Sequence, residues 1–592
     1  MARKPLIFLL LVIFPVFAVA CSPTPATVAT RSTTPPPITT TTATPSPTPP
    51  EASTPTATAT PTSTKTPNLQ FSFDKDRKVW FDYIQFLDTN SQVIQTIDFG
   101  LSDRKYLSEG WNNPEYWDQY WTYRVKSYIC SCKNIASLSI PVPENARFLK
   151  IRAATTDKWG QLSRNLVVKE YKDLMADTVK METSLNGRVV DNQVELHARM
   201  QIHYANLSPL SDSDGDGVKD GEDINPRVPT PHPVKSDINV ALNYMVSWNQ
   251  ETKLRSEDLN IGTLVHPSIG YYHSDDPDIV DWHIKWAVEH GISTFVIGCF
   301  ISPTGRQEQD FENGFLRAKF LPYIKYFVAY TDMGLLPGNQ WGNSGEGLET
   351  LPTVAIEYLS RNHFDGPQYL KVGDRPVFED ICIMSDYYDK PGLEKYTKVM
   401  DNFRVAGKTY GYDIYLIGGI MDVWKGPNNE LMAKQLDAIS CYMISDAGTD
   451  GWKPNEKGGY SVTGPYSTMG SGYVQYCKYW LPLINKNNVR MVPPIASGMN
   501  NQLMYDMGID NWLNNHTNPS PEEFKKFCIA MNDYIDPVLN MVIIYAWNEF
   551  HEGTALEPTE EWGFSYLDAL REVYCTEPES GYPPNITPQG VK

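Results

Sequence analysis

From residue 237 onward, short apolar runs alternate with longer segments in which apolar residues recur every three or four positions. The runs have the length of strands and are rich in β-branched and aromatic residues, whereas the longer segments have the period of amphipathic helices. The predicted strands are 239–248, 293–301, 326–333, 375–384, 414–420, 438–444, 490–498 and 541–550. The clearest helical segments are 278–290, 314–325, 350–361, 394–406, 469–486, 521–535 and 564–574.

Eight strand and helix pairs in residues 237–577 predict an α/β domain with the (β/α)8 architecture of a TIM barrel. An open doubly wound sheet is the alternative, but no glycine-rich phosphate-binding sequence follows the first strand. In a TIM barrel the active site lies at the carboxyl ends of the strands, so the pattern also indicates where to look for chemistry. Residues 578–592 are expected to form a C-terminal tail.

Residues 69–205 have a different pattern, in which short segments alternate apolar and polar residues and turn residues separate them. Examples are 78–83, 136–140 and 148–153. This period predicts an antiparallel β-sandwich before the barrel. The stretch 148–168 resembles the last hairpin of a fibronectin type III-like module. Two roles stay open for this region, which are glycan binding and support or spacing of the barrel.

The amino terminus has the pattern of an export signal. Residues 1–21 contain two basic residues, an apolar core at 6–19 and small residues before Cys21. The sequence AVAC at 18–21 resembles a bacterial lipobox, which predicts lipidation of Cys21 and a membrane-anchored lipoprotein at the bacterial cell surface. The alternative is simple cleavage after Ala20 and secretion. Residues 22–68 are almost entirely Ser, Thr, Pro and Ala, which predicts a disordered linker.

A twelve-residue acidic loop, DSDGDGVKDGED at 212–223, lies in the segment 206–236 between the two predicted domains. Its positions 1, 3, 5, 9 and 12 are Asp and its position 6 is Gly, which is the spacing of calcium-binding loops. The loop resembles those of thrombospondin type 3 and dockerin modules. It predicts a structural Ca²⁺ site, and the alternative is a flexible acidic linker. The expected ligands are Asp212, Asp214, Asp216, the Val218 carbonyl, Asp220 and Asp223.

The net charge of −19 argues against a nucleic-acid partner, because such a partner requires a basic surface. An aromatic content of 12% suits surfaces that face carbohydrate, although it is also found in ordinary large α/β proteins. Composition therefore argues against a nucleic-acid partner and is compatible with a glycan partner.

Chemistry-bearing residues concentrate at the end of the last predicted strand, in MVIIYAWNEFHEGTALEPT at 541–559. Three carboxylates and an imidazole crowd one strand end, where like charges raise one another's pKa and acid/base chemistry becomes possible. An acidic surface loop is the alternative, but Trp547 and Phe550 place large apolar surface among the charges. The candidate catalytic residues are Glu549 and Glu552. The candidate substrate-binding residues, chosen because rings stack on sugars and polar groups bind hydroxyls, are Tyr244, Trp248, Tyr271, Tyr272, Asp332, Tyr442, Asn548, His551 and Glu557.

Three stretches resemble glycoside hydrolase family 99 and its WbsX-type relatives. They are HPSIGYYHSDDPDIVDWHIKWAVEHGI from His266, YLKVGDRPVF from Tyr369 and WNEFHEGTALEPT from Trp547. The last is the most specific, because residues 549–554 match the family signature of Glu, aromatic, His, Glu, Gly and Thr, with Phe550 where Trp is more usual. The resemblance covers residues 238–575 and implies a retaining endo-α-1,2-mannosidase or mannanase on a TIM barrel, with a polysaccharide substrate.

The resemblance also implies a mechanism without an enzyme nucleophile or a catalytic cofactor. Glu549 would take the proton of the sugar 2-hydroxyl, which attacks its own anomeric carbon to give a 1,2-anhydro sugar. Glu552 would protonate the leaving oxygen and then activate the water that opens the epoxide. We expect a raised pKa for the acid and an ordinary pKa for the base.

The chain departs from the family pattern at the ends of the first two strands, in NYMVSW at 243–248 and IGCF at 297–300. These positions line sugar subsites in the family, so the identity of the sugar stays open. Three functions remain possible. They are an exported hydrolase of an α-linked polysaccharide, a double-displacement glycosidase or transferase on the same barrel, and a surface glycan-binding lipoprotein without turnover.

Overall fold

The computed structural model describes much of the chain from residue 68 to residue 591. The described ranges are 68–75, 79–98, 115–117, 126–130, 135–140, 142–155, 178–197, 201–208, 210–246, 248, 265–298, 306–330, 351–383, 390–420, 428–508, 511–588 and 590–591. The predicted signal, Cys21 and most of the predicted linker lie outside them. Within the described ranges, no helix combines the length and the apolar character needed to cross a membrane.

The strands before residue 208, here called the antiparallel β region, form two sheets. One has the order β6-β1-β8-β9, and the other has the order β10-β7-β2-β5-β4 with β3 paired to β2. Every pairing within the two sheets is antiparallel, as the alternating pattern predicted. The strands are β1 (Asn68–Phe73), β2 (Val79–Leu87), β3 (Val93–Asp98), β4 (Glu115–Trp117), β5 (Lys126–Cys130), β6 (Ile135–Ser139), β7 (Phe148–Thr155), β8 (Val179–Leu185), β9 (Arg188–Leu196) and β10 (Gln201–Asn206).

The two antiparallel sheets share one hydrophobic core. Phe71 of β1 and Phe81 of β2 lie on different sheets, yet their ring centroids are 5.1 Å apart. Both side chains are fully buried in a cluster that also contains Leu138 of β6 and Ile151 of β7. Alternate residues of β1 and of β7 therefore face this core, as period-two patterning requires. The likeness to a fibronectin type III module stays a prediction.

The second part of the chain is built on one parallel sheet with the order β20-β17-β16-β15-β13-β12-β11-β23-β21. Neighbouring strands along this path run parallel. The strands coincide with the predicted ones to within a few residues. They are β11 (Asn239–Met245), β12 (Ile292–Gly298), β13 (Lys325–Tyr330), β15 (Arg375–Ile383), β16 (Tyr415–Ile420), β17 (Ala438–Ser440), β20 (Arg490–Met491), β21 (Pro494–Ala496) and β23 (Met541–Tyr545).

One segment closes this sheet into a barrel. β20 pairs with β17, whereas β21, which begins three residues after β20 ends, pairs with β23 on the other side. The backbone between them continues both contacts, because Val492 N–H donates to the Ile439 carbonyl at 2.9 Å and Ile543 N–H donates to the Pro493 carbonyl at 3.2 Å. The two short strands are thus one seventh barrel strand, and the α/β TIM-barrel prediction is confirmed at the level of sheet topology.

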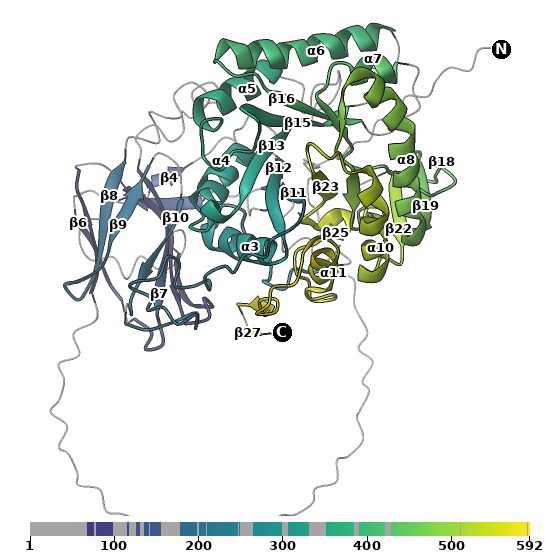
Figure 1. Cartoon of the computed structure of the whole chain (residues 1–592). Coiled ribbons are helices and arrows are strands. Elements are labelled where there is room, and N and C mark those ends of the chain that lie inside the picture. The colour runs from purple at the N-terminus through teal and green to yellow at the C-terminus, as the bar shows by residue number, and fades with distance from the viewer. Residues whose placement is uncertain are drawn as a thin grey trace, which may run out of the picture. The chain divides into compact units, whose positions relative to one another are not determined.

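Amphipathic helices cover the outside of the barrel, as Figure 1 shows for α5, α6, α8, α10 and α11. Their apolar faces join the barrel strands in one large core. The main helices are α3 (Pro277–Glu289), α4 (Arg306–Asn313), α5 (Leu351–Asn362), α6 (Lys390–Thr409), α8 (Tyr466–Asn487), α10 (Pro521–Met531) and α11 (Ser565–Tyr574).

The predicted helix at 314–325 is wrong. The structure has two 3-10 turns there, η3 (Phe315–Arg317) and η4 (Leu321–Tyr323), and the α-helix α4 lies before them. Pro322 carries no backbone N–H and so cannot continue an i to i−4 ladder. Gly314, just before η3, lies so close to the carbonyl of Ser274 that even a methyl group would collide with it.

Candidate active site

The candidate site lies just beyond β23, the last barrel strand. β24 (Asn548–Glu549) pairs with β25 (Thr554–Ala555), with Glu549 opposite Thr554, and the 3-10 turn η8 (Phe550–Glu552) joins them. We call residues 548–555 the glutamate turn. Gly553 ends η8 with a φ of 62°, a left-handed conformation that favours glycine. The motif singled out in the sequence is therefore one tight turn that carries both candidate catalytic glutamates.

Backbone contacts tie the glutamate turn to the end of the seventh strand. The carbonyl of Glu552 accepts hydrogen bonds from Asn500 N–H at 2.7 Å and from Thr554 Oγ1 at 3.1 Å. The Thr554 hydroxyl also lies 3.2 Å from the Gly498 carbonyl, which it can reach as a donor. These contacts explain why the signature has Gly and Thr directly after the second glutamate, because both are needed to fold the turn back on its neighbour.

Both glutamates are buried, each with 2% of its surface exposed. Burial raises the pKa of Glu549 from its ordinary value to about 8, because a carboxylate loses hydration there. This differs from the expectation that the proposed base keeps an ordinary pKa. The cause is the depth of the turn, which the residue types alone do not reveal.

Asn548 fixes the glutamate turn to the first barrel strand. Its Oδ1 accepts the backbone N–H of Met245 at 2.8 Å, and its Nδ2 donates to the Met245 carbonyl at 3.0 Å. Its own carbonyl accepts the indole N–H of Trp248 at 3.0 Å. Asn548 and Trp248 are both buried, so the two predicted site residues pack together at the end of β11.

A buried polar chain runs behind Asn548 and contains three more of the predicted residues. Asn548 Nδ2 lies 3.0 Å from the hydroxyl of Tyr272, which donates to Glu557 Oε2 at 2.7 Å. His283 Nε2 lies 3.5 Å from the same carboxylate oxygen, and His283 Nδ1 lies 2.9 Å from the hydroxyl of Tyr244. Burial, together with the charge of Glu557, raises the pKa of both tyrosines well above the ordinary value, so their hydroxyls stay protonated.

His283 belongs to this hydrogen-bonded polar chain but is not among the residues predicted from the sequence. It lies on α3 and is fully buried. A signal was present, because His283 falls three residues after Val280 and four before Ala287, on the apolar face of the predicted helix. A histidine on such a face needs polar partners within the core, and here the partners are Tyr244 of β11 and Glu557, two residues after β25.

The segment 265–276, here called the site loop, runs along the residues that follow the glutamate turn. Ser268 N–H donates to the Pro558 carbonyl at 2.8 Å, and Glu560 N–H donates to the His266 carbonyl at 2.8 Å. The imidazole of His266 pairs with the carboxylate of Glu561. Tyr271, in the middle of the loop, is half-buried, with its ring edge-on to that of His266 at 6.4 Å.

Of the remaining predicted substrate-binding residues, only the side chain of Tyr442 is described by the structure. Tyr442 is 8% exposed and its ring centroid lies 4.2 Å from that of Tyr545. The side chain of His551 and the whole of Asp332 lie outside the described residues. The structure thus brings Tyr244, Trp248, Tyr272, Asn548 and Glu557 together behind the glutamate turn, and their contact with a substrate stays a prediction.

Glu379 is a further buried carboxyl on a barrel strand, in the middle of β15. On β15, Phe378 packs on Phe403 of the surrounding helix α6, so the next residue, Glu379, faces the interior of the barrel. Its strand neighbour is Ala329 of β13, which pairs in turn with Gly298 of β12. Glu379 is 1% exposed, and burial raises its pKa to about 8.

The acidic loop at 212–223 gathers three of its predicted ligands. Asp212, Asp214 and Asp216 each place one carboxylate oxygen within 4.8 Å of the others. Burial and the neighbouring charges of Asp216 and Asp223 raise the pKa of Asp214 to about 7. Such mutual repulsion is what a divalent cation relieves.

The other predicted ligands lie outside this group of three. Both carboxylate oxygens of Asp220 accept hydrogen bonds from Ser213, each at 2.7 Å. Asp223 Oδ1 accepts the N–H of Asn225 at 3.0 Å, and burial raises its pKa. Val218 donates its N–H to Asp216 Oδ1 at 2.8 Å. The described geometry therefore brings together half of the expected ligand set, and a calcium site stays a prediction.

Comparison with known families gives one match. Residues 353–570 match the family described as "Glycosyltransferase WbsX". This stretch includes β15 and the glutamate turn, and it confirms the resemblance to WbsX-type proteins over that part of the chain. A comparison with curated proteins gives no match.

Solved structures give distant likenesses. A "glycoside hydrolase-like protein" is 17% identical, with a TM-score of 0.43 over 59% of this chain and 97% of that one. The GH99 endo-α-mannosidase of Bacteroides thetaiotaomicron is 16% identical, with a TM-score of 0.41 over 57% and 96%. A β-glucuronidase of Bacteroides uniformis is 11% identical, with a TM-score of 0.29 over 83% and 45%. All three TM-scores lie below 0.5, so these likenesses carry no argument about function.

Proposed function

We propose that this protein is a glycoside hydrolase that cleaves an α-linked polysaccharide, with Glu549 and Glu552 as its catalytic carboxyl groups. The observation that carries the proposal is the glutamate turn. Two buried glutamates, three residues apart, are fixed by hydrogen bonds at the carboxyl end of the last barrel strand, where TIM-barrel enzymes have their active sites. The turn also lies within the stretch that matches the WbsX family.

The proposed reaction has two steps. In the first, Glu549 removes the proton of the sugar 2-hydroxyl, the 2-oxygen attacks the anomeric carbon, and the glycosidic bond breaks as Glu552 gives its proton to the leaving oxygen. In the second, Glu552 takes a proton from water, which attacks the anomeric carbon, and Glu549 returns its proton to the 2-oxygen as the epoxide opens. Both glutamates end in their starting states, so the cycle balances.

The raised pKa of Glu549 supports a proton-transfer role. A carboxyl with a pKa of about 8 is ionised in about a tenth of molecules at pH 7, but the ionised form is a much stronger base than an ordinary carboxylate. A general acid and base work best when their pKa values lie near the working pH.

A glycosyltransferase is the second candidate function, and the name of the matching family, "Glycosyltransferase WbsX", favours it. In that case the same two carboxyl groups would act on an activated donor sugar, and the acceptor would be another sugar hydroxyl instead of water. The two candidates differ in what they consume, since only a transferase depends on a donor such as a sugar nucleotide. A surface glycan-binding protein without turnover is the third.

The test is reducing-end release from a panel of α-mannans and α-glucans by the wild type and by Glu549→Gln and Glu552→Gln. We expect cleavage of one polymer and a loss of about 10²- to 10⁴-fold in each variant. Glu560→Gln is the matched control, because it removes the same charge from an exposed position nearby and should keep full activity. Turnover only with a sugar-nucleotide donor would favour the transferase, and retention of a polymer without cleavage would favour the binding protein.

We also propose that the protein is exported and anchored through a lipid on Cys21, which the signal-like segment at 1–21 supports. Metabolic labelling with a radioactive fatty acid tests this proposal. Label in the wild type and its loss in Cys21→Ala are expected. Release of unlabelled wild-type protein into the medium would favour simple secretion instead.

A structural Ca²⁺ ion in the loop 212–223 is proposed on the convergence of Asp212, Asp214 and Asp216. Because the pKa of Asp214 is about 7, binding should release a proton and strengthen as the pH rises through 7. Calorimetric titration at pH 6 and pH 8 measures both effects. Asp214→Asn should abolish binding, and equal weak binding by the wild type and this variant would contradict the site.

A further inference from the structure

We infer that Lys150 and Arg152 of β7 are positioning residues for the proposed active site, because they hold Asp275 and Asp276 and thereby fix the site loop against the glutamate turn. The inference gives the antiparallel β region a role in the reaction. The predicted effect on catalysis rests on the proposed function. The predicted ordering of the site loop can be measured whether or not that function is correct.

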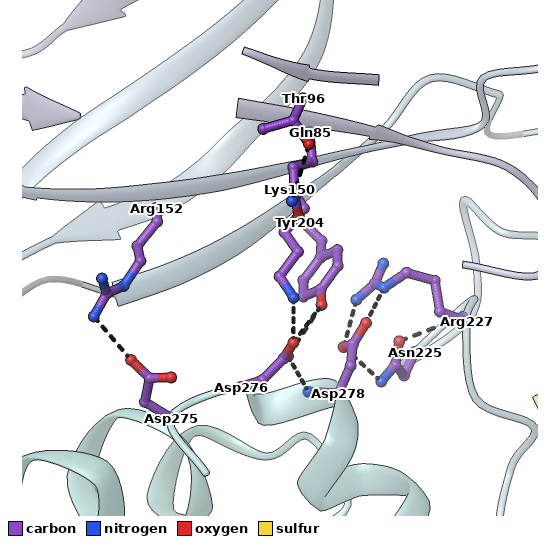
Figure 2. Close-up of polar contacts among 10 residues, drawn as sticks. All are labelled: Gln85, Thr96, Lys150, Arg152, Tyr204, Asn225, Arg227, Asp275, Asp276 and Asp278. Carbon is purple, nitrogen blue, oxygen red and sulfur yellow. Dashed lines mark hydrogen bonds and ion pairs between the residues drawn. The ribbon is translucent and has the colours of Figure 1, made fainter. Parts of the chain in front are cut away.

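The first contact is between β7 and the start of α3 (Figure 2). Lys150 Nζ lies 2.5 Å from Asp276 Oδ2, and the hydroxyl of Tyr204 lies 3.0 and 3.1 Å from the two oxygens of the same carboxylate. Asp276 is the N-cap residue of α3 and accepts the N–H of Asp278 at 3.1 Å. Burial alone would lower the pKa of Lys150, but the charge of Asp276 keeps it above the ordinary value. One carboxylate thus joins the cap of the helix to the antiparallel β region.

The second contact is made by Arg152, two residues along β7. Its guanidinium lies 2.7 Å from Asp82 on the neighbouring strand and 3.2 Å from Asp275 in the site loop. The side chains of Arg152 and Asp275 are 13% and 4% exposed, so the pair is largely removed from water. Arg152 holds the pKa of Asp275 below its ordinary value although burial opposes this. A buried pair of this kind fixes geometry, because either charge alone would be strongly disfavoured.

The third contact anchors the helix itself. Arg227, in the segment between the two parts of the chain, pairs with Asp278 and also lies over the ring of Tyr204, 4.1 Å from its centroid. Asn225 Nδ2 donates to Asp278 and to Asp281 of the same helix, at 3.2 and 2.7 Å. Figure 2 shows Tyr204, Asn225, Arg227 and Asp278 side by side at the amino-terminal end of α3. Lys150, Arg152 and Arg227 therefore hold neighbouring residues at the same helix end.

The fixed end of the site loop leads directly to the proposed active site. Ser274, adjacent to Asp275, donates its N–H to the Trp248 carbonyl at 2.6 Å and accepts the Trp248 N–H on its hydroxyl at 3.1 Å. Two residues earlier, Tyr272 bonds to Asn548, which is bonded covalently to Glu549. The path from Lys150 to the glutamate turn is thus Asp276, three residues of loop, Tyr272 and Asn548. Catalytic groups need such support, because a displacement of about 1 Å costs about a hundredfold in rate.

The alternative is that these ion pairs only stabilise the fold. A second contact between the two parts of the chain provides the matched control. Arg317 of η3 donates to Gln201 Oε1 of β10 at 2.6 Å and lies 3.1 Å from His203 Nδ1. Neither of these two hydrogen bonds involves the site loop. Loss of Arg317 should therefore weaken the contact between the antiparallel β region and the barrel without loosening the glutamate turn.

The experiment compares Lys150→Met with Arg317→Met in the intact chain. Hydrogen exchange of the peptides covering 265–276 and 547–557 reports the ordering of the loop and of the turn. We expect exchange about tenfold faster in Lys150→Met than in Arg317→Met. Lys150→Arg should restore slow exchange. Tyr204→Phe, which removes one hydroxyl from Asp276, is the mild variant to use if Lys150→Met does not fold, and it should show the same effect at smaller size.

Kinetics on the cleaved polymer give the second measurement. Lys150→Met is expected to lower kcat by about tenfold or more and to shift the rising limb of the pH profile to lower pH, because a loosened turn admits water to Glu549. Arg317→Met should leave kcat and the pH profile unchanged. Equal loop exchange in the two variants overturns the inference. A wild type without turnover on any polymer overturns the proposed function instead, and hydrogen exchange then still decides whether Lys150 orders the loop.

Discussion

Asn548 completes the hydrogen bonding of Met245 at the end of the first barrel strand. Its side-chain amide accepts the Met245 N–H at 2.8 Å and donates to the Met245 carbonyl at 3.0 Å, so it takes the place of a neighbouring strand. The residue beside the proposed base is therefore also the residue that ties the last strand to the first.

This relationship predicts a large effect for Asn548→Asp. A carboxylate there would face the Met245 carbonyl without a proton to share, so the free energy of unfolding should fall by about 3 kcal/mol or more. Chemical denaturation measures the loss. Asn540→Asp is the control, because that amide also donates to a carbonyl but is exposed, and it should change stability little. Equal losses in the two variants would show that the buried contact of Asn548 stabilises the fold no more than the exposed contact of Asn540.

The pKa of Glu549 predicts the pH dependence of the proposed reaction. If Glu549 is the base, kcat/KM should rise with pH to a midpoint of about 8, because the carboxyl must lose its proton before it can accept another. The rising limb should be absent from the residual activity of Glu549→Gln. A falling limb at about pH 8 that is lost in the same variant would make Glu549 the acid and exchange the roles of the two glutamates.

Replacing Glu379 with a neutral side chain is predicted to raise the free energy of unfolding at neutral pH. Its pKa is about 8 in the folded protein against about 4.3 in an unfolded chain, so the folded state binds the proton more tightly. Raising the pH from about 4 to 8 therefore lowers the free energy of unfolding, and at pH 7 the loss is of the order of 2 to 4 kcal/mol. Glu379→Gln, which stays neutral, should be more stable than the wild type at pH 7 and equal to it near pH 4.

Denaturation curves at pH 4.5, 6 and 7.5 measure this trend for Glu379→Gln. The exposed Glu456→Gln is the control and should show no such pH dependence. A pH-independent difference for Glu379→Gln would mean that its carboxyl ionises normally. If the variant also loses activity on the cleaved polymer, Glu379 belongs to the site, which its position inside the barrel already favours.

A side chain at position 314 is predicted to displace the site loop, because Gly314 packs against Ser274. An ideal Cβ at this position would lie 1.9 Å from the carbonyl oxygen of Ser274, so Gly314→Ala must displace the loop or the start of η3. We expect a loss of about 1 to 3 kcal/mol in the free energy of unfolding together with lower activity. Gly411→Ala, where nothing lies within 4 Å but φ is +87°, tests backbone strain alone. It should lower stability by about 1 kcal/mol and leave activity unchanged.

The sequence predicted the barrel well because parallel strands and their covering helices have different periods of apolar residues. The strands at 239–248 and 541–550 were found within a few residues of β11 and β23. The helix at 314–325 was wrong, since the apolar residues there pack as two 3-10 turns around Pro322. Local periodicity over one or two turns cannot distinguish these structures.

The residues of the candidate site could be predicted from the sequence. Which of them face the barrel interior and which face the surrounding helices could not. Barrel strands are apolar on both faces, so alternation alone does not say which face of β11 points outward. The hydroxyl of Tyr244 contacts His283 on α3, a partner 39 positions away that only the fold brings near. The raised pKa of Glu549 likewise follows from the depth of its turn, which depends on contacts with Asn500 and Met245.

The closure of the barrel by its last strand has a consequence for synthesis. β23 pairs with both β11 and β21, and it is made after every other barrel strand. A ribosome therefore delivers the two glutamates together with the strand that closes the sheet. Any chain that stops before residue 541 leaves the edges of β11 and β21 unpaired and also lacks both carboxyl groups. Unpaired strand edges promote aggregation, so a chain that lacks the proposed catalytic pair would also tend to aggregate.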